Sequence, residues 1–192
     1  MKTYTEHIFE ELVDNSTEEK IRRYLERKRR EREEFETNRP HPKTRKELQD
    51  LIVDAIKEKG SDVDLNYIDV SGIDNMGYLF SMYYKEKVGD SLSQNSMLLK
   101  NFRGDISEWD VSSVKTMEAM FYEAEYFNGD ISEWDVSSVK TMDEMFWGAQ
   151  NFDQDLSNWK VDKAEYSRYT FKNCPIQDCH EPHFNKDHFL LC

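Results

Sequence analysis

The sequence predicts an α/β fold, a short solenoid of strands and helices with an N-terminal helical arm and a capping helix. The first observation is a repeat: residues 102–126 and 127–151 share most of a 25-residue sequence, and a diverged third copy begins at Phe152. The second is the spacing of apolar residues in each copy, which changes from alternation to steps of three and four. Such self-similarity is typical of proteins whose units bury their apolar faces only against their neighbours.

One strand and one short helix are expected in each repeat. In residues 105–110, Ile106 and Trp109 stand among polar residues, which is typical of a strand and a turn. From Val114 to Ala124 the apolar residues recur every three or four positions, which indicates a short helix with a serine N-cap. Tryptophans and methionines at equivalent positions are expected in the core: Trp109, Trp134, Trp159, Met117, Met120, Met142 and Met145.

Four segments are expected along the chain. They are a charged helical arm at 1–39, a capping helix at 40–64, the repeats at 65–173 and a C-terminal cap at 174–192. A partial repeat at 66–80 aligns with 107–121, which implies an inserted loop near 81–100. The capping helix is expected to begin after the capping box Thr44–Glu47 and to end at Gly60.

Two of these segments have alternative interpretations. The helix of the arm, from Ser16 in a capping box with Glu19 to about Glu36, is charged on all sides. It is either a solvated arm supported by pairs such as Glu26–Arg30 or a surface for a partner. The inserted loop is either tolerated variation in length or a loop that contacts a partner from a rigid scaffold.

The formal net charge of −13 disfavours direct binding of nucleic acid or of anionic membranes. Residues 101–165 hold five Lys/Arg and fifteen Asp/Glu, so most of the acidity belongs to the repeats. No stretch is apolar enough for a membrane span or a signal peptide. With the odd cysteine count at Cys174, Cys179 and Cys192, this predicts the cytoplasm, or the cell surface if a leader has been removed.

Repeated carboxylates are the candidate binding residues. Equivalent positions of paired neighbouring chains lie about 4.8 Å apart, so such carboxylates repel unless they are hydrogen-bonded, paired with cations or facing a partner. Either the Asp side chains accept turn amides, as in Asx turns, or they form a binding face. The two Glu lie outside turn chemistry, which favours partner contact. The candidates are Asp105, Glu108, Asp110, Asp130, Glu133, Asp135 and Asp155.

The sequence indicates no catalytic chemistry. It has no nucleophile–base motif, phosphate-binding glycine loop or metalloprotease motif, so neither an enzyme nor a cofactor is expected. No metal site is expected either, because no loop has the spacing of a calcium loop. The tail from Cys174 to Cys192 offers zinc ligands, but their spacing matches no standard finger. A cap formed by Phe184, Phe189, Leu190 and Leu191 over the last repeat is the preferred interpretation.

The repeated phrase resembles the repeat of BspA-like bacterial surface proteins, a divergent leucine-rich-repeat-like family. The resemblance covers residues 102–171 clearly and about 65–80 partially. It rests on residues that fall where the family places them: Phe127, Gly129, Asp130, Ile131, Trp134, Asp135, Val136, Val139, Met142, Met145 and Phe146. It implies a leucine-rich-repeat-like solenoid that binds proteins or host surfaces.

Three functions follow from these observations. The first is a non-catalytic protein-interaction module that binds a protein partner, with a basic surface as one kind, through the solenoid face or the inserted loop. The second is an acidic intracellular inhibitor, such as an immunity or anti-defence protein, that blocks a basic nucleic-acid-binding protein. The third is a bacterial surface adhesin, which the resemblance favours and the missing signal peptide opposes.

Overall fold

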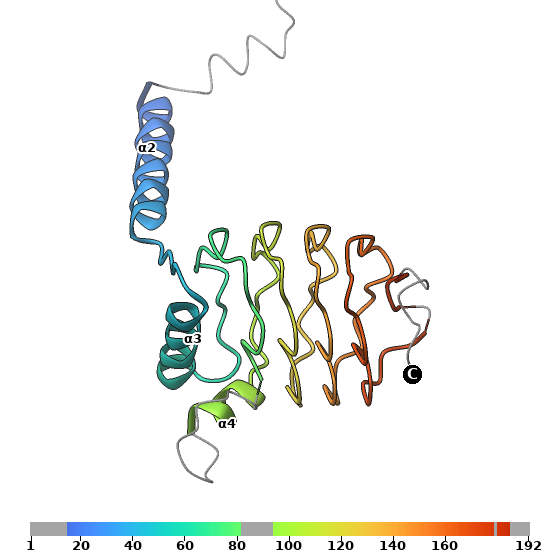
Figure 1. Ribbon diagram of the computed structural model, residues 1–192. Helices are drawn as coiled ribbons and strands as arrows, with labels where there is room; N and C mark the ends of the chain where they lie inside the picture. The colour runs from blue at the N-terminus through green and yellow to red at the C-terminus, as the bar shows by residue number, and fades with distance from the viewer. Residues whose placement is uncertain (1–14, 82–93, 179, 185–192) are drawn as a thin grey trace, which may run out of the picture. The chain divides into compact units, whose positions relative to one another are not determined.

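The computed structural model describes residues 15–81, 94–178 and 180–184, and the chain divides into two units, Met1–Arg39 and Pro40–Cys192. The first unit contains helix α2 (Asn15–Asn38), close to the bounds expected for the charged arm (Figure 1). Its ion pairs include Arg23–Glu19 at 2.6 Å and Lys28–Glu31 at 2.8 Å, both on the surface. Four apolar residues of α2 stay at least half exposed: Ile21, Tyr24, Leu25 and Phe35. The expected capping box at Ser16 lies outside the described side chains.

The second unit begins with helix α3 (Arg45–Lys59), and the expected N-cap, Thr44, is confirmed, although Glu47 reaches the residue before it. The Thr44 hydroxyl accepts the Glu47 N–H at 3.2 Å, and the Glu47 carboxylate accepts the Lys43 N–H at 2.7 Å. The helix ends at Gly60, whose φ of 91° lies in the region that favours glycine and whose N–H donates to the Ile56 carbonyl. One face of α3 is buried against the repeats, as the apolar spacing predicts: Leu48, Ile52, Val53, Ala55 and Ile56.

The expected strand–helix solenoid is wrong. In the described part of the chain the repeats contain no α-helix and no extended strand, so neither a leucine-rich repeat nor an α/β solenoid is supported. Each 25-residue repeat is a succession of turns, and successive repeats lie side by side (Figure 1). The β-type pairing between described repeats consists of isolated parallel bridges: Asp64–Asp105, Asn75–Thr116, Thr116–Thr141 and Thr141–Tyr166.

Backbone hydrogen bonds between repeats explain why the expected helix is absent. In the segment 117–123, the N–H groups of alternate residues donate to the next repeat: Met117 to Thr141, Ala119 to Asp143, Phe121 to Met145 and Glu123 to Trp147, at 2.7 to 2.9 Å. A helix would direct the same N–H groups to carbonyls four residues earlier in the same segment. Between them, the N–H groups of Met120 and Tyr122 close turns by donating to the carbonyls three residues earlier, at Met117 and Ala119, each at 3.2 Å.

Left-handed residues make this alternation possible. Ala119, Glu144 and Tyr169 occupy one position of successive repeats and have φ angles of 50°, 57° and 58°. A second position has the same property, with φ of 53° at Glu123, 68° at Gly148 and 59° at Asn173. Residues other than glycine rarely adopt such φ angles. The hydrogen bonds between repeats must therefore offset the free-energy cost of this backbone conformation. We call residues 117–123, 142–148 and 167–173 the ladder segments.

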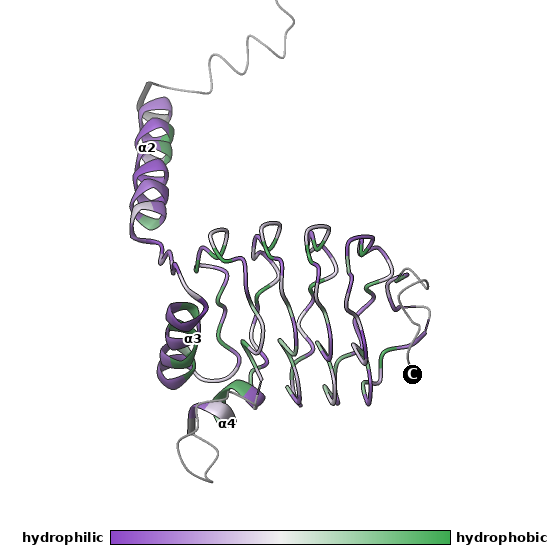
Figure 2. Cartoon of the chain, in the orientation of Figure 1, coloured by the Kyte–Doolittle hydropathy of each residue, from purple (hydrophilic) through white to green (hydrophobic). Residues whose placement is uncertain are grey.

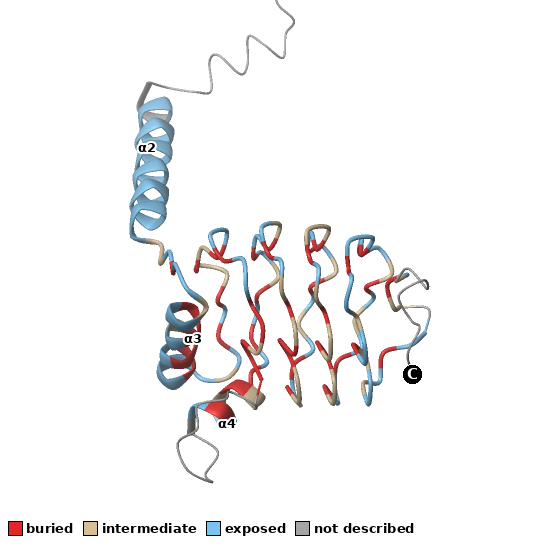
Figure 3. Ribbon diagram, in the orientation of Figure 1, coloured by how far each residue is buried: buried red, intermediate tan, exposed pale blue. Residues whose placement is uncertain are grey.

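Two columns of phenylalanine rings form the core of the stack. Phe80, Phe121, Phe146 and Phe171 stack at centroid distances of 5.2 to 5.5 Å, with interplanar angles of 4° to 8°. Phe102, Phe127 and Phe152 form the second column at 5.9 to 6.0 Å. The two columns contact each other, and the ring centroids of Phe121 and Phe127 are 4.2 Å apart. The buried positions recur at equivalent places along the stack (Figure 3), so each repeat contributes the same layer of the core.

The partial repeat aligns as the sequence predicts. Leu65, Val70 and Met76 are buried at positions equivalent to Ile106, Val111 and Met117. Within the expected insertion, residues 94–100 form the short helix α4 (Gln94–Lys100), which contacts α3 and buries Leu99. Residues 82–93, where a partner-contacting loop is a prediction, lie outside the described residues. Apolar residues recur at intervals along the stack and in α3 (Figure 2), and many of them belong to the buried core.

The two ends of the stack are covered differently. At the first repeat, Arg45 and Gln49 of α3 donate to the carbonyls of Gly77 and Leu79, each at 2.9 Å. At the last repeat, Phe184 lies 6.5 Å from Phe171, and Ile176 is buried. These residues match the expected position of a C-terminal cap, although Phe189, Leu190 and Leu191 lie outside the described residues.

Candidate functional site

The five candidate aspartates all build turns. In each case one carboxylate oxygen accepts the N–H of the serine two residues later, at 2.9 to 3.1 Å. These are Asx turns, one of the two interpretations of the repeated acids. The carboxylates remain exposed, so turn formation does not remove them from solvent: Asp105, Asp110, Asp130, Asp135 and Asp155.

The turns hold most of these carboxylates in the ionised form. The Ser107 N–H lowers the pKa of Asp105, and the Ser132 N–H does the same for the pKa of Asp130. The serine hydroxyls are the first cause of the lowered pKa of Asp135 and of Asp155. Asp105 acts against the lowering of the Asp130 pKa, which shows that neighbouring repeats bring like charges close together.

Glu108 and Glu133 lie outside this turn network. Both are exposed, and neither carboxylate has a hydrogen-bond or ion-pair partner within residues 15–81, 94–178 and 180–184. The Glu108 backbone N–H is held by the Asn66 side chain at 2.9 Å, which fixes the base of that side chain. We call the seven exposed acids the carboxylate row: Asp105, Glu108, Asp110, Asp130, Glu133, Asp135 and Asp155. That this row binds a partner stays a prediction.

The row continues into the first repeat, which the sequence reasoning missed. Asp64 accepts the Asn66 N–H at 2.8 Å, and Asp69 accepts the Ser71 N–H at 2.9 Å. Asp69 falls on Asp110 within the alignment of the partial repeat, and extending that alignment by two residues places Asp64 on Asp105. The Ser71 hydroxyl and N–H, together with His41 at 2.7 Å, lower the pKa of Asp69 to about 2.

A column of tryptophans lies directly behind the carboxylate row. Trp109, Trp134 and Trp159 are only 3% to 5% exposed, which confirms the prediction that they belong to the core. Each indole N–H donates to a carbonyl of the preceding repeat: Leu65, Ile106 and Ile131, at 3.0 to 3.2 Å. The column therefore fixes how one repeat is seated on the next, and with it the spacing of the acids.

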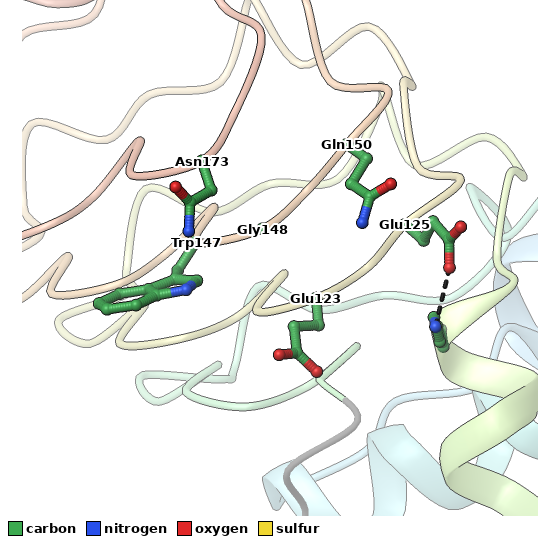
Figure 4. Close-up of a pocket in the computed structure, with 7 residues that line it drawn as sticks. Glu123, Glu125, Trp147, Gly148, Gln150 and Asn173 are labelled. Atoms are coloured by element: carbon green, nitrogen blue, oxygen red, sulfur yellow. Dashed lines mark ion pairs between the residues drawn. The ribbon is translucent and has the colours of Figure 1, made fainter.

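One pocket is lined by residues of three successive repeats and by Lys100 (Figure 4). It has a volume of about 330 Å³. Its lining contains the left-handed residues Glu123, Gly148 and Asn173 from three successive repeats. Gln150 and the Lys100–Glu125 ion pair, 2.8 Å long, also line it. The sequence contains no signal for this pocket, because two of the three left-handed residues are neither glycine nor part of a turn motif.

The Trp147 ring at this pocket already contacts two other side chains of the chain. The Tyr122 ring stacks on it at 5.8 Å, and the Lys172 ammonium lies 4.6 Å from its centroid. The same ammonium lies 4.6 Å from the Tyr169 ring. The aromatic surface is therefore used for packing, and the polar groups that line the pocket are carboxylates, side-chain amides and the Lys100 ammonium, which is paired with Glu125.

Neither a metal centre nor a reactive thiol is present in the described residues. Within 15–81, 94–178 and 180–184, no group of three His, Cys, Asp or Glu is arranged to hold a metal ion. Three of the tail ligands, Cys179, His188 and Cys192, lie outside them. Cys174 occupies the repeat position of Ala124 and Ala149, and its thiol donates to the Phe152 carbonyl at 3.3 Å. Burial raises the pKa of Cys174 to about 11, which keeps it protonated at neutral pH.

Among the described residues, no helix combines the length and the apolar character that crossing a bilayer requires.

One comparison with known proteins gives a match. Residues 91–181 match the family described as "Mycoplasma protein of unknown function, DUF285". That family is associated with BspA-like surface repeat proteins, but the match does not establish which repeat family the chain represents. Comparisons with curated proteins and with solved structures find no match.

Proposed function

We propose that this chain is a protein-interaction module whose carboxylate row binds a protein partner with a basic surface. The observation that supports this is the regular display of exposed acids on a fixed backbone. Turn amides hold most of the Asp side chains ionised, and the Glu108 and Glu133 carboxylates have no hydrogen-bond or ion-pair partner among the residues that the structure describes. Charged arrays of this kind contribute mainly to association rate and specificity.

The seating of the repeats supports the same proposal. Indole hydrogen bonds and stacked rings set the distance between equivalent acids, so the row is ordered before a partner arrives. A preorganised surface binds with less loss of conformational entropy than a flexible acidic tail. The matching family is of unknown function by its own description, so it supports no particular activity.

Charge reversal within the row tests the proposal. The tagged wild-type chain and the double variant Glu108→Lys/Glu133→Lys would each capture proteins from a lysate treated with nuclease. A partner bound by the row should be lost from the double variant. The matched control is Asp54→Lys/Glu58→Lys, which makes the same change of charge at exposed positions of α3. Equal loss from both variants, or from neither, would contradict the proposal.

A second candidate is an acidic inhibitor that covers a nucleic-acid-binding site on its target. It is favoured by the fifteen Asp/Glu against five Lys/Arg in residues 101–165, which resembles the charge density of a phosphate backbone. Such a complex should weaken steeply with salt and should exclude nucleic acid from the captured protein. A partner that survives high salt and still binds nucleic acid would support the general interaction module instead.

A further inference from the structure

In the last repeat, several backbone groups have no hydrogen-bond partner among the described residues. In the earlier ladder segments, alternate N–H groups donate to the following repeat, as in Met142 to Tyr166 and Gly148 to Lys172. The equivalent N–H groups of the last repeat make no hydrogen bond to any residue that the structure describes: Ser167, Tyr169, Phe171 and Asn173. The Glu165 carbonyl, equivalent to the acceptors at Lys115 and Lys140, is also unfilled in that part of the chain.

These five groups define one register. At each earlier junction, a residue donates its N–H to the carbonyl before the bridge and accepts from the N–H after it, as Thr141 does with Lys115 and Met117. An occupant at the last repeat would form the same parallel bridge with Tyr166 and then offer three more carbonyls at alternate residues. Such an array of unpaired groups is a template for an added extended segment. Tyr169 is 51% exposed, Asn173 is exposed, and Ser167 and Phe171 are partly exposed, so solvent reaches each of these four residues.

The sign of the charge changes at this end. The internal segments 116–123 and 141–148 each contain two acids and no Lys or Arg. The last segment, 166–173, contains Arg168 and Lys172 and no acid. Arg168 is exposed and makes no ion pair with a described residue, while Lys172 is held between Trp147 and Tyr169. The last ladder segment therefore favours an acidic partner segment, although most of the repeat region is itself acidic.

A second copy of this chain fits the last ladder segment poorly. The carbonyls that a second copy would have to offer are those of its first repeat. There, Arg45 and Gln49 already donate to Gly77 and Leu79. The apolar end of the core is also partly covered, because Phe184 packs against Phe171. The last repeat can therefore recognise a segment whose backbone carbonyls accept its free N–H groups and whose side chains carry negative charge.

We propose that the ladder segment 167–173 is a docking edge for an extended, acidic segment of a partner protein, added in parallel register. This surface differs from the carboxylate row and selects the opposite charge. It therefore goes beyond the proposed function, and either proposal can fail alone.

A peptide of residues 139–148 of this chain, VKTMDEMFWG, is the probe, because it supplies the matching carbonyls at Thr141, Asp143, Met145 and Trp147. It would be added to the full chain labelled for amide-resolved hydrogen exchange. In the free chain, the N–H groups of residues 167, 169, 171 and 173 should exchange much faster than those of 142, 144, 146 and 148. The peptide should slow these four N–H groups about tenfold or more.

Two substitutions test the charge preference. Arg168→Glu should weaken peptide binding by about fivefold, because it reverses a rim charge beside the edge. Lys140→Glu is the matched control at an exposed site of the preceding repeat and should leave binding unchanged. A peptide with Asp143→Lys and Glu144→Lys should not protect the edge.

Three results would overturn the proposal. The first is equal protection of both ladder segments in the free, monomeric chain, which would mean that the edge is already covered. The second is protection that grows with protein concentration without peptide, which would assign the edge to a second copy. The third is a peptide that leaves the four N–H groups unprotected, or that binds Arg168→Glu as well as wild type.

Discussion

The indole N–H of Trp134 donates to the carbonyl oxygen of Ile106, 3.2 Å away in the preceding repeat. Both groups are buried, and the same bond recurs at Trp109 and Trp159. A tertiary hydrogen bond thus repeats with the sequence and ties each repeat to the previous one. Tryptophan at this position therefore provides a hydrogen-bond donor, which a purely apolar buried residue would not.

Trp134→Phe should lower the free energy of unfolding by about 2 to 4 kcal/mol. The substitution removes the donor, leaves the Ile106 carbonyl without its partner and opens a small cavity beside the ring. Denaturant titration followed by circular dichroism measures the change. Tyr126→Phe is the control, since Tyr126 is 43% exposed and should shift stability by less than about 0.5 kcal/mol. Equal effects of the two substitutions would mean that the bond between repeats contributes nothing measurable.

Gly104 provides a second test of how the repeats are seated. A Cβ at this position would overlap the Val63 carbonyl oxygen of the preceding repeat and lie 2.6 Å from Cε2 of Phe102. Gly104→Ala should therefore destabilise the chain by about 3 kcal/mol or prevent folding, because backbone and a packed ring must both move.

The effect should be specific to the site of the added methyl group. At Gly72, a Cβ would meet nothing within 4 Å, so Gly72→Ala should be neutral or slightly stabilising. Thermal unfolding of both variants separates the two cases. A folded Gly104→Ala chain of wild-type stability would show that the junction between the first two repeats is looser than the structure indicates.

The order of the repeats and the identity of the core were predictable from the sequence. The 25-residue period places equivalent residues in register. Large apolar side chains at those positions can be buried only between neighbouring repeats. Helices α2 and α3 were predictable as well, α3 through Thr44 and Gly60. These features depend on local pattern or on composition, which a single sequence displays directly.

The conformation inside each repeat was not predictable in the same way. Val114, Met117 and Phe121 have the spacing of a helix face, but a series of tight turns places residues three and four apart on one side too. What decides between them is the N–H partner, which lies 24 residues along the chain for Met117. Left-handed residues would have been a signal, but Ala119 and Tyr169 are not residue types that indicate them.

Glu144 tests whether these left-handed positions are costly. Its φ is 57°, where glycine is unstrained and a β-branched residue is strongly disfavoured. Glu144→Gly should be neutral or stabilise by up to about 1 kcal/mol, and Glu144→Val should destabilise by about 1 to 2 kcal/mol. Denaturant midpoints of the two variants give the comparison. The opposite order of stability would show that position 144 does not hold this backbone conformation in solution.

Acid should destabilise the fold through the Asx turns. The pKa of Asp69 is lowered from 3.8 to about 2, and those of Asp105, Asp130, Asp135 and Asp155 are lowered as well. A lowered folded-state pKa means that the carboxylate stabilises the fold above its unfolded pKa. That contribution is lost as pH falls through the folded pKa. Stability should therefore decline from about pH 4 to pH 2, as measured by denaturant midpoints across that range.

Asp69→Asn isolates one turn from the rest. The amide oxygen of Asn can still accept the Ser71 N–H, but the side chain no longer ionises, so the Ser71 and His41 contacts lose their charge-assisted strength. The variant should be less stable than wild type at pH 6, and the difference should shrink as pH falls from 4 to 2. Asp54→Asn, at an exposed position of α3, is the charge-matched control. A constant difference across this range would mean that Asp69 does not titrate with the fold, and the acid sensitivity would then lie elsewhere.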